Sequence, residues 1–315
     1  MEIEKMFQGM DYVYEVYKEM SFSRAAKNLY ISQPSLSAAV KKVESQIGFP
    51  IFDRSSNPIR LTEPGKEYIR SAERIMEVEH GFQNYVNDMQ GLKSGGIAIG
   101  GTNLFVSYVL PPLLSRFTEN FPMLHVNLVE ASTSELEEKL SSGALDLMID
   151  SQSMDSVVFE KKFFCEEHLL LVVPKSLRSN EKVEKYALTI SDIKANRHLD
   201  ADVLPVPLEH FREDCFLLLK SGNDTRNRAE KICRKSGHFY PRARLELDQQ
   251  ITAYNLSRYG MGISFNGDIL IRHMPDDGSL VYYKLGYPDA VRNVNFYYKR
   301  NRYITKMVSA FLNLI

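Results

Sequence analysis

Residues 21–48 read SFSRAAKNLYISQPSLSAAVKKVESQIG and predict two short helices joined by a tight turn. Ser21 is a suitable N-cap for a helix over 22–29, and Ser32 for a second helix with Pro34 in its first turn. In that second helix, apolar residues recur at spacings of four, three and four: Leu36, Val40, Val43 and Ile47. Its opposite face is small and polar, which is typical of the recognition helix of a helix-turn-helix.

The flanking residues extend this pattern to a small module. Residues 6–20 carry apolar side chains at helical spacing, and residues 50–54 and 59–62 flank a Ser-Ser-Asn-Pro turn that predicts a hairpin. With Arg54 and Arg60 near its tip, such a hairpin is a wing able to reach the DNA backbone. A three-helix unit packed for stability alone has the same periodicity, so the pattern by itself leaves both interpretations open.

The charge balance bears on this choice. The 315 residues carry 39 Lys and Arg against 40 Asp and Glu, a formal net charge of −1, which argues against a nucleic-acid partner. The charges are segregated, however, because residues 21–66 hold seven basic residues against three acidic ones. So modest an excess predicts weak DNA binding by a single copy, and therefore a protein that dimerises to bind DNA well.

Length and composition exclude several classes. The length predicts two or three domains, and no apolar run approaches the roughly 18 residues that cross a membrane. The N-terminus lacks the apolar core of a signal peptide. Three widely spaced cysteines without a C-x-x-C pair fit a reducing compartment. We therefore expect a cytoplasmic protein. A redox pair formed by Cys215 and Cys233 stays open as an alternative.

Residues 63–93 predict one long helix with a seam for a partner helix. From Tyr68 to Leu92, seven of eight positions spaced alternately three and four residues apart are apolar or aromatic. A period of 3.5 residues is typical of a coiled coil, whereas a helix packed on its own domain has a wider stripe. The predicted dimerisation residues are Ile75, Val78, Phe82, Tyr85 and Met89.

From residue 94 onward, strands and helices alternate. The first segments predict a β-α-β-α-β order and a parallel sheet, over 97–101, 109–120, 125–130, 134–142 and 145–150. Ligands bind such sheets beyond the carboxyl ends of the strands, where the loops here are rich in hydroxyl and amide groups. At helix N-termini these groups suit a small anion such as a carboxylate, although the same residue types are ordinary N-caps.

Four motifs in register together resemble the winged helix-turn-helix of LysR-type transcriptional regulators: 21–29, 31–37, 47–54 and 61–65. Softer motifs at 143–149 and 259–265 resemble strands of that family's effector-binding domain. The sequence departs from the family at Ala38 and Ala39, where longer polar side chains are common, and at Asn266, where proline is usual.

The resemblance implies a multidomain protein, with a winged helix-turn-helix dominated by α-helices, a long linker helix, and a two-lobed α/β domain like type 2 periplasmic binding proteins. The implied boundaries are 1–62 for the DNA-binding domain, 63–93 for the linker, 94–161 with 267–315 for the first lobe, and 162–266 for the second. The expected base contacts come from Gln33, Ser35 and Ser37, and the expected phosphate or minor-groove contacts from Arg24, Ser32, Lys41, Arg54 and Arg60. The implied effector-binding residues are Thr102, Asn103, Ser132, Thr133, Asn223 and Thr225.

We therefore expect a LysR-type transcriptional regulator whose effector, a small anionic metabolite, binds between the two lobes. The expected partners are double-stranded DNA with a pseudo-palindromic operator, the small-molecule effector, further copies in a dimer or tetramer, and RNA polymerase, without a cofactor, metal or membrane. A ligand-independent regulator, a cysteine-redox regulator and an enzyme built on the two-lobed domain stay open. The enzyme is the weakest alternative, because the chain has no G-x-S-x-G, H-E-x-x-H or Walker motif.

Overall fold

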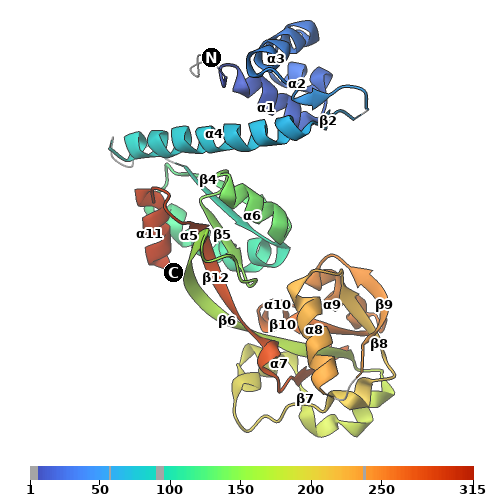
Figure 1. Ribbon diagram of the computed structural model, residues 1–315. Coiled ribbons are helices and arrows are strands. Elements are labelled where there is room, and N and C mark those ends of the chain that lie inside the picture. The colour runs from blue at the N-terminus through green and yellow to red at the C-terminus, as the bar shows by residue number, and fades with distance from the viewer. Residues whose placement is uncertain (1–5, 57, 90–95, 237–238) are drawn as a thin grey trace. The chain divides into compact units, whose positions relative to one another are not determined.

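The computed structural model describes residues 6–56, 58–89, 96–236 and 239–315 (Figure 1). The chain divides into two compact units, Met1–Val86 and Asn87–Ile315. The sequence Lys-Ser-Gly-Gly at 93–96 predicts a hinge-like break, and all of it except Gly96 lies outside the described residues.

The first unit is a helix-turn-helix with a hairpin and the start of a long helix. The Ser21 side chain accepts the Arg24 N–H and the Ser32 side chain accepts the Ser35 N–H, so both N-caps are confirmed. Phe52 pairs with Leu61 in an antiparallel hairpin, as predicted. The elements are α1 (Met10–Glu19), α2 (Phe22–Asn28), α3 (Gln33–Ile47), β1 (Phe52–Asp53), β2 (Arg60–Leu61) and α4 (Glu63–Met89).

The first turns of α4 belong to the core of this unit. Tyr68 is buried, its ring stacks on Phe7 at 5.1 Å between centroids, and its hydroxyl donates to the Met6 carbonyl at 3.3 Å. At Gly65 an added Cβ would lie 2.1 Å from the Ile51 carbonyl oxygen, so glycine permits the close approach of α4 to this loop. The pattern that placed Tyr68 in a partner-facing seam is therefore wrong at that residue, because the unit's own core covers it.

The second unit is built on a ten-stranded mixed sheet with the main order β4-β3-β5-β12-β6-β10-β8-β9. Strand β3 is parallel to β4 and β5, which confirms the predicted parallel order, and β8 is parallel to β9 and β10. The strands are β3 (Gly96–Gly101), β4 (His125–Glu130), β5 (Leu147–Asp150), β6 (Phe159–Pro174), β7 (Ala187–Leu188), β8 (Cys215–Leu219), β9 (Arg242–Leu247), β10 (Ile263–Gly267), β11 (Leu280–Lys284) and β12 (Val291–Lys299).

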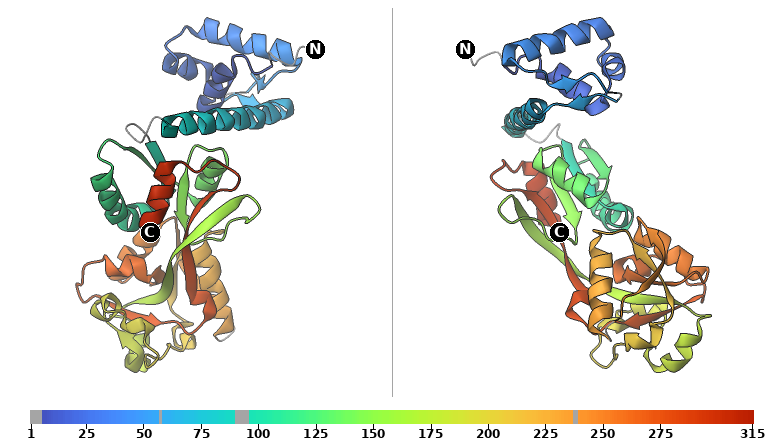
Figure 2. Two further views of the ribbon diagram at one scale, coloured as in Figure 1. Left: turned by 90° about the vertical axis from the view of Figure 1, so that its left-hand side faces the viewer. Right: turned by 45° about the vertical axis from the view of Figure 1, so that its right-hand side comes forward.

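Two strands, β6 and β12, join two lobes of this unit (Figures 1 and 2). The first lobe is built around β3, β4 and β5, and the second around β8, β9 and β10. The principal helices are α5 (Leu110–Asn120), α6 (Thr133–Ser141), α7 (Ile190–Lys194), α8 (Asp224–Lys235), α9 (Gln250–Arg258), α10 (Asp268–Arg272) and α11 (Lys306–Leu314).

The joining strands are longer than the sequence pattern predicts. The apolar pattern predicts strands only over 168–174 and 295–299, whereas β6 begins at Phe159 and β12 at Val291. Charged residues break the apolar pattern in both early halves, and pairing between β6 and β12 holds them extended. The pairing shifts register between Val294 and Asn295.

One expected lobe boundary is wrong. The resemblance places β11, within residues 267–315, in the first lobe, but β11 pairs with residues 170–174 of β6 and with β7. These partners belong with the second lobe, so the chain re-enters the first lobe along β12. The motif at the end of β10 does not indicate which strand β11 pairs with, because that pairing joins segments far apart in the sequence.

Candidate functional site

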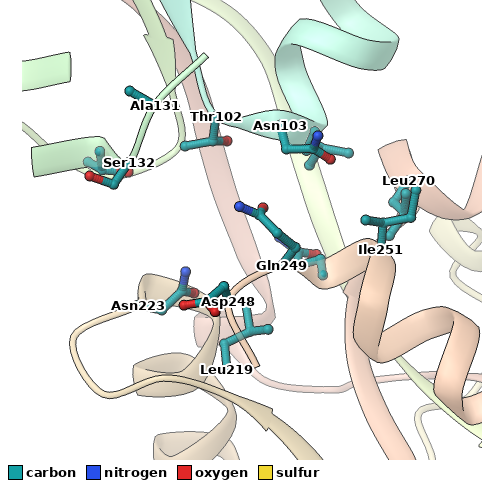
Figure 3. A pocket seen from close by; sticks show the side chains of 13 residues that line it. Thr102, Asn103, Ala131, Ser132, Leu219, Asn223, Asp248, Gln249, Ile251 and Leu270 are labelled. Carbon is teal, nitrogen blue, oxygen red and sulfur yellow. The ribbon is translucent and has the colours of Figure 1, made fainter. Parts of the chain in front are cut away.

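A cleft lies between the two lobes of the second unit, beyond the carboxyl ends of β3, β4, β8 and β9. It comprises adjoining cavities of about 200 Å³ and about 410 Å³. In Figure 3, Thr102, Asn103 and Ser132 lie on one side, with Asn223 and Asp248 opposite. The structure brings together at this cleft all the residues that the sequence suggested for effector binding: Thr102, Asn103, Ser132, Thr133, Asn223 and Thr225.

Several of these side chains also act as helix caps. Ser132 forms a capping box with Glu135 at the start of α6, and Asn223 accepts the Thr225 N–H at 2.9 Å at the start of α8. The two interpretations of these loops are therefore compatible, because capping places the helix N-termini at the cleft. The partial positive charge of a helix N-terminus favours anionic or electron-rich ligand atoms there.

A buried charge cluster, missed in the sequence, forms one wall of the cleft. The Nε of Arg292 donates to Glu167 at 2.7 Å, and its Nη1 donates to Asp224 and to the Thr225 hydroxyl, both at 3.0 Å. An added Cβ at Gly267 would lie 1.8 Å from Glu167 Oε1, so glycine allows this carboxylate to fit. Burial raises the pKa of Glu167, and the positive charge of Arg292 opposes that rise.

A second set of residues missed in the sequence joins neighbouring loops within each lobe. Asp150 is buried and accepts the Thr133 hydroxyl at 2.8 Å and the Gln152 N–H at 2.7 Å. Burial raises the pKa of Asp150, while the Gln152 N–H, the Thr133 hydroxyl and the charge of Arg292 oppose the rise. Asp248 forms an ion pair with Lys220 at 2.7 Å.

The unusual Asn266 has a structural role at this cleft. It is buried and donates through Nδ2 to the Gln250 carbonyl at 2.9 Å, while the Gly267 N–H donates to Gln250 Oε1 at 3.1 Å. Gln250, which lines the cleft, in turn donates to the Thr225 hydroxyl at 3.3 Å. Asn266 and Gly267, at the end of β10, therefore hold Gln250 in place.

The polar face of α3 is exposed in the first unit. Gln33 and Ser35 are exposed, and Ser37 is partly so. Arg54 donates to the Ser37 hydroxyl at 3.2 Å, pairs with Glu44 at 2.9 Å, and lies 4.7 Å over the Phe22 ring. Arg54 thus ties the hairpin to α3.

The remaining predicted DNA contacts differ in their surroundings. Arg24 pairs with Glu19 at 3.1 Å, and the Ser32 hydroxyl is engaged in its cap and lies 2.7 Å from the Ser35 hydroxyl. Lys41 and Arg60 are exposed.

Along α4 the seam becomes exposed after its first turns. Ile75 is partly buried against the core of the first unit. Val78, Phe82 and Tyr85 are 72%, 69% and 45% exposed. The side chain of Met89 lies outside the part of the chain that the structure describes.

The described cysteines and histidines form no metal site. Burial raises the pKa of Cys165 and of Cys233 to about 12, so neither thiol ionises readily near neutral pH. Over residues 6–56, 58–89, 96–236 and 239–315, no group of three or more His, Cys, Asp or Glu could hold a metal ion. No helix in these ranges is long and apolar enough to span a membrane.

Two family models match the chain. Residues 7–66 match the model described as bacterial regulatory helix-turn-helix protein, lysR family. Residues 90–315 match the LysR substrate binding domain.

Two relatives that align with nearly the whole chain are described as transcriptional regulators. The uncharacterized HTH-type transcriptional regulator YcgK of Bacillus subtilis (strain 168) is 30% identical over 97% of this chain and 92% of its own length. A protein of Gracilaria tenuistipitata var. liui described as "Probable RuBisCO transcriptional regulator" is 24% identical over 94% of this chain and 91% of its own.

Solved structures share the fold. A full-length OxyR variant from Pseudomonas aeruginosa is 20% identical, with a TM-score of 0.69 over 97% of this chain and 93% of its own. Full-length CbnR, solved in complex with its target DNA, is 18% identical, with a TM-score of 0.64 over 98% of each chain.

Proposed function

The chain belongs to the LysR family of bacterial helix-turn-helix transcriptional regulators, and from this premise we propose how its two units act on DNA. It is a regulator of transcription and not an enzyme, with a first unit that binds DNA and a second that binds a small-molecule effector. The observation that carries the proposal is the cleft, where residues from both lobes converge in a chain that also has an exposed recognition helix.

DNA binding is assigned to α3 and the hairpin. Gln33 and Ser35 would contact base edges in the major groove, with a smaller contribution from Ser37. Lys41 and Arg60 would contact phosphates. A supporting role is assigned to Arg24, Ser32 and Arg54, whose contacts within the first unit are described above. The two arginines would add positive charge, and Ser32 a hydrogen-bond donor, near the DNA phosphates.

Dimerisation is assigned to the exposed part of α4. Val78, Phe82 and Tyr85 form an apolar stripe that a second α4 helix would cover, with Ile75 and Met89 at its ends. A dimer would place two recognition helices on a pseudo-palindromic site, and pairing of dimers would give a tetramer. The CbnR structure with its target DNA supports a DNA-bound form of this fold.

The effector would close the cleft and alter how the dimers sit on DNA, and through this the recruitment of RNA polymerase. The protein would act in the cytoplasm. The proposed boundaries between the lobes lie along β6 and β12, the two strands that run from one lobe to the other. The chain returns to the first lobe along β12.

The DNA-binding assignment is tested on the full-length protein with a fragment selected from random double-stranded DNA. Gln33→Ala should weaken binding to the selected fragment about tenfold and relax specificity, since one good base contact contributes about 1–3 kcal/mol. Lys41→Ala should weaken binding to all sequences and lower the salt dependence. Fluorescence anisotropy measures both, with Lys231→Ala, an exposed lysine of α8, as the control. Equal binding by Gln33→Ala and the control would refute the assignment of α3.

The dimerisation assignment has its own test. Phe82→Glu should shift the full-length protein toward monomer in sedimentation velocity, because a carboxylate would be buried in the helix pair. Val157→Glu is a matched control, since Val157 is also a highly exposed apolar residue, 78% exposed, but lies in the second unit. A Phe82→Glu protein with the oligomeric state of the wild type would refute the role of α4.

A further inference from the structure

The charges that line the cleft are predominantly negative. Among the described residues that line the larger of the two cavities, four are carboxylates and two are cations. The carboxylates are Glu137, Asp150, Asp224 and Asp248, and the cations are Lys220 and Arg292. The hydroxyl and amide loops suggested an anionic effector from sequence, but this balance does not favour one.

Both cations already have carboxylate partners. Arg292, whose side chain is 3% exposed, is held between Glu167 and Asp224 at 2.7 Å and 3.0 Å. Asp224 also accepts from Arg228 at 2.7 Å. Lys220 pairs with Asp248 at 2.7 Å. An anionic ligand at Arg292 would have to displace one of its carboxylates, and breaking a buried pair is costly. Lys220 is exposed, so its attraction for an anion is screened by water and already shared with Asp248.

Two of the carboxylates are placed to receive a cation. Asp150 accepts hydrogen bonds from the Thr133 hydroxyl and the Gln152 N–H, which are both uncharged groups. Glu137 lies one helical turn after Thr133 on α6, on the same face, and also lines the cavity. The two carboxylates therefore flank one side of the cavity, on the first lobe.

We propose that the effector carries a primary ammonium group, which binds between Asp150 and Glu137. An ammonium has three donors, which fit carboxylate oxygens with unused lone pairs. Such a charge-assisted hydrogen bond is stronger than one between neutral groups. The inference rests on the proposed function, since it concerns the ligand of the same cleft.

The loops at the helix N-termini would bind the rest of the ligand. The starts of α6 and α8 and the side chains of Asn103 and Asn223 offer hydrogen bonds to a second polar group. A carboxylate in that place makes the ligand an amino acid, and a second ammonium near Asp248 makes it a diamine. The shared chemistry is the ammonium, and the experiment separates the two sources.

The test uses thermal shift and isothermal titration on the full-length protein. The probes are the common L-amino acids, their amides and putrescine, each set beside an analogue without the ammonium, such as L-lactate for L-alanine and 1,4-butanediol for putrescine. We expect saturable binding of an ammonium-bearing probe and none of its analogue. Binding of an amino acid but not its amide identifies a zwitterion, whereas binding of putrescine identifies a diamine.

Variants locate the ammonium. Asp150→Asn and Glu137→Gln should each raise the Kd of the binding probe about tenfold or more, as expected for loss of a charged hydrogen bond. The single asparagine oxygen can still accept the Gln152 N–H, and the asparagine NH2 group can donate to the Thr133 hydroxyl oxygen, so the fold has little reason to change. Glu138→Gln is the matched control, because Glu138 is exposed on the same helix and does not line the cavity.

The outcomes separate the two levels of the proposal. Saturable binding of a carboxylate without an ammonium, failure of every ammonium probe, or an unchanged Kd in both variants overturns the inference. Binding of the selected DNA fragment, measured on the same samples, tests the function itself. A protein that binds DNA and discriminates no ammonium loses only the inference, whereas one that binds no DNA loses the proposed function.

Discussion

Arginine residues of the two units have opposite surroundings. The side chain of Arg292 is 3% exposed and neutralises Glu167, which is fully buried. The side chain of Arg54 is 32% exposed and pairs with Glu44 of α3, whose side chain is 13% exposed. Removing one partner of a buried pair leaves an uncompensated charge, whereas an exposed pair loses little because water screens it. The junction of the lobes therefore depends on its buried charges for stability, whereas the stability of the face that we propose to bind DNA depends less on charge.

The largest expected effect is that of Arg292→Met. It should reduce the free energy of unfolding by about 3–5 kcal/mol, since Glu167 would be left buried without its cation. Urea unfolding followed by circular dichroism measures this on the full chain. Adding Glu167→Gln to Arg292→Met should restore part of the loss. A single variant as stable as the wild type would contradict the comparison.

A smaller, pH-dependent effect is expected at Asp268. Burial alone would raise its pKa, but hydrogen bonds from His198 at 3.1 Å, the His168 N–H at 3.0 Å and Arg272 at 2.7 Å outweigh burial and lower it. Because the folded pKa is lowered, the stabilisation is present above the unfolded value of about 3.9 and is lost as pH falls through the folded pKa.

Asp268→Asn should therefore lower the melting temperature at pH 7 and reduce the free energy of unfolding by about 2–3 kcal/mol, the scale of a charged hydrogen bond. The difference from the wild type should shrink as the pH falls below about 4. Thermal unfolding at both pH values measures this. A difference that grows on acidification would show that the carboxylate is not stabilised in its ionised form.

The smallest effect on stability is expected for Arg54→Ala, less than about 1 kcal/mol, because the pair with Glu44 is partly solvated. Its effect on DNA affinity should be larger than its effect on stability, since the hairpin would lose its tie to Ser37. Anisotropy and thermal unfolding of the same variant compare the two. A large loss of stability with normal DNA binding would reverse the roles assigned to the two arginines.

The local elements of the first unit could be predicted because their signals are local. The caps at Ser21 and Ser32, the apolar face of α3 and the turn of the hairpin each depend on residues a few positions apart. The same reasoning failed at Tyr68, where the repeat continues unbroken while the surroundings change from core to solvent. A periodic apolar stripe on a helix does not indicate whether the core of the same unit or a partner helix covers it.

The helix-turn-helix, the parallel order of the first lobe and the hydroxyl-rich loops of the cleft can all be predicted from the amino-acid sequence, because each depends on spacing and residue type over a short stretch. The early halves of β6 and β12, the place of β11 and the charge of the cleft depend instead on contacts between distant segments. Glu167, Asp224 and Arg292 come from three distant segments, and no local pattern relates them. Their pairing leaves Asp150 and Glu137 as the carboxylates available to a ligand, because electrostatic balance depends on which charges meet in space and not on how many the chain contains.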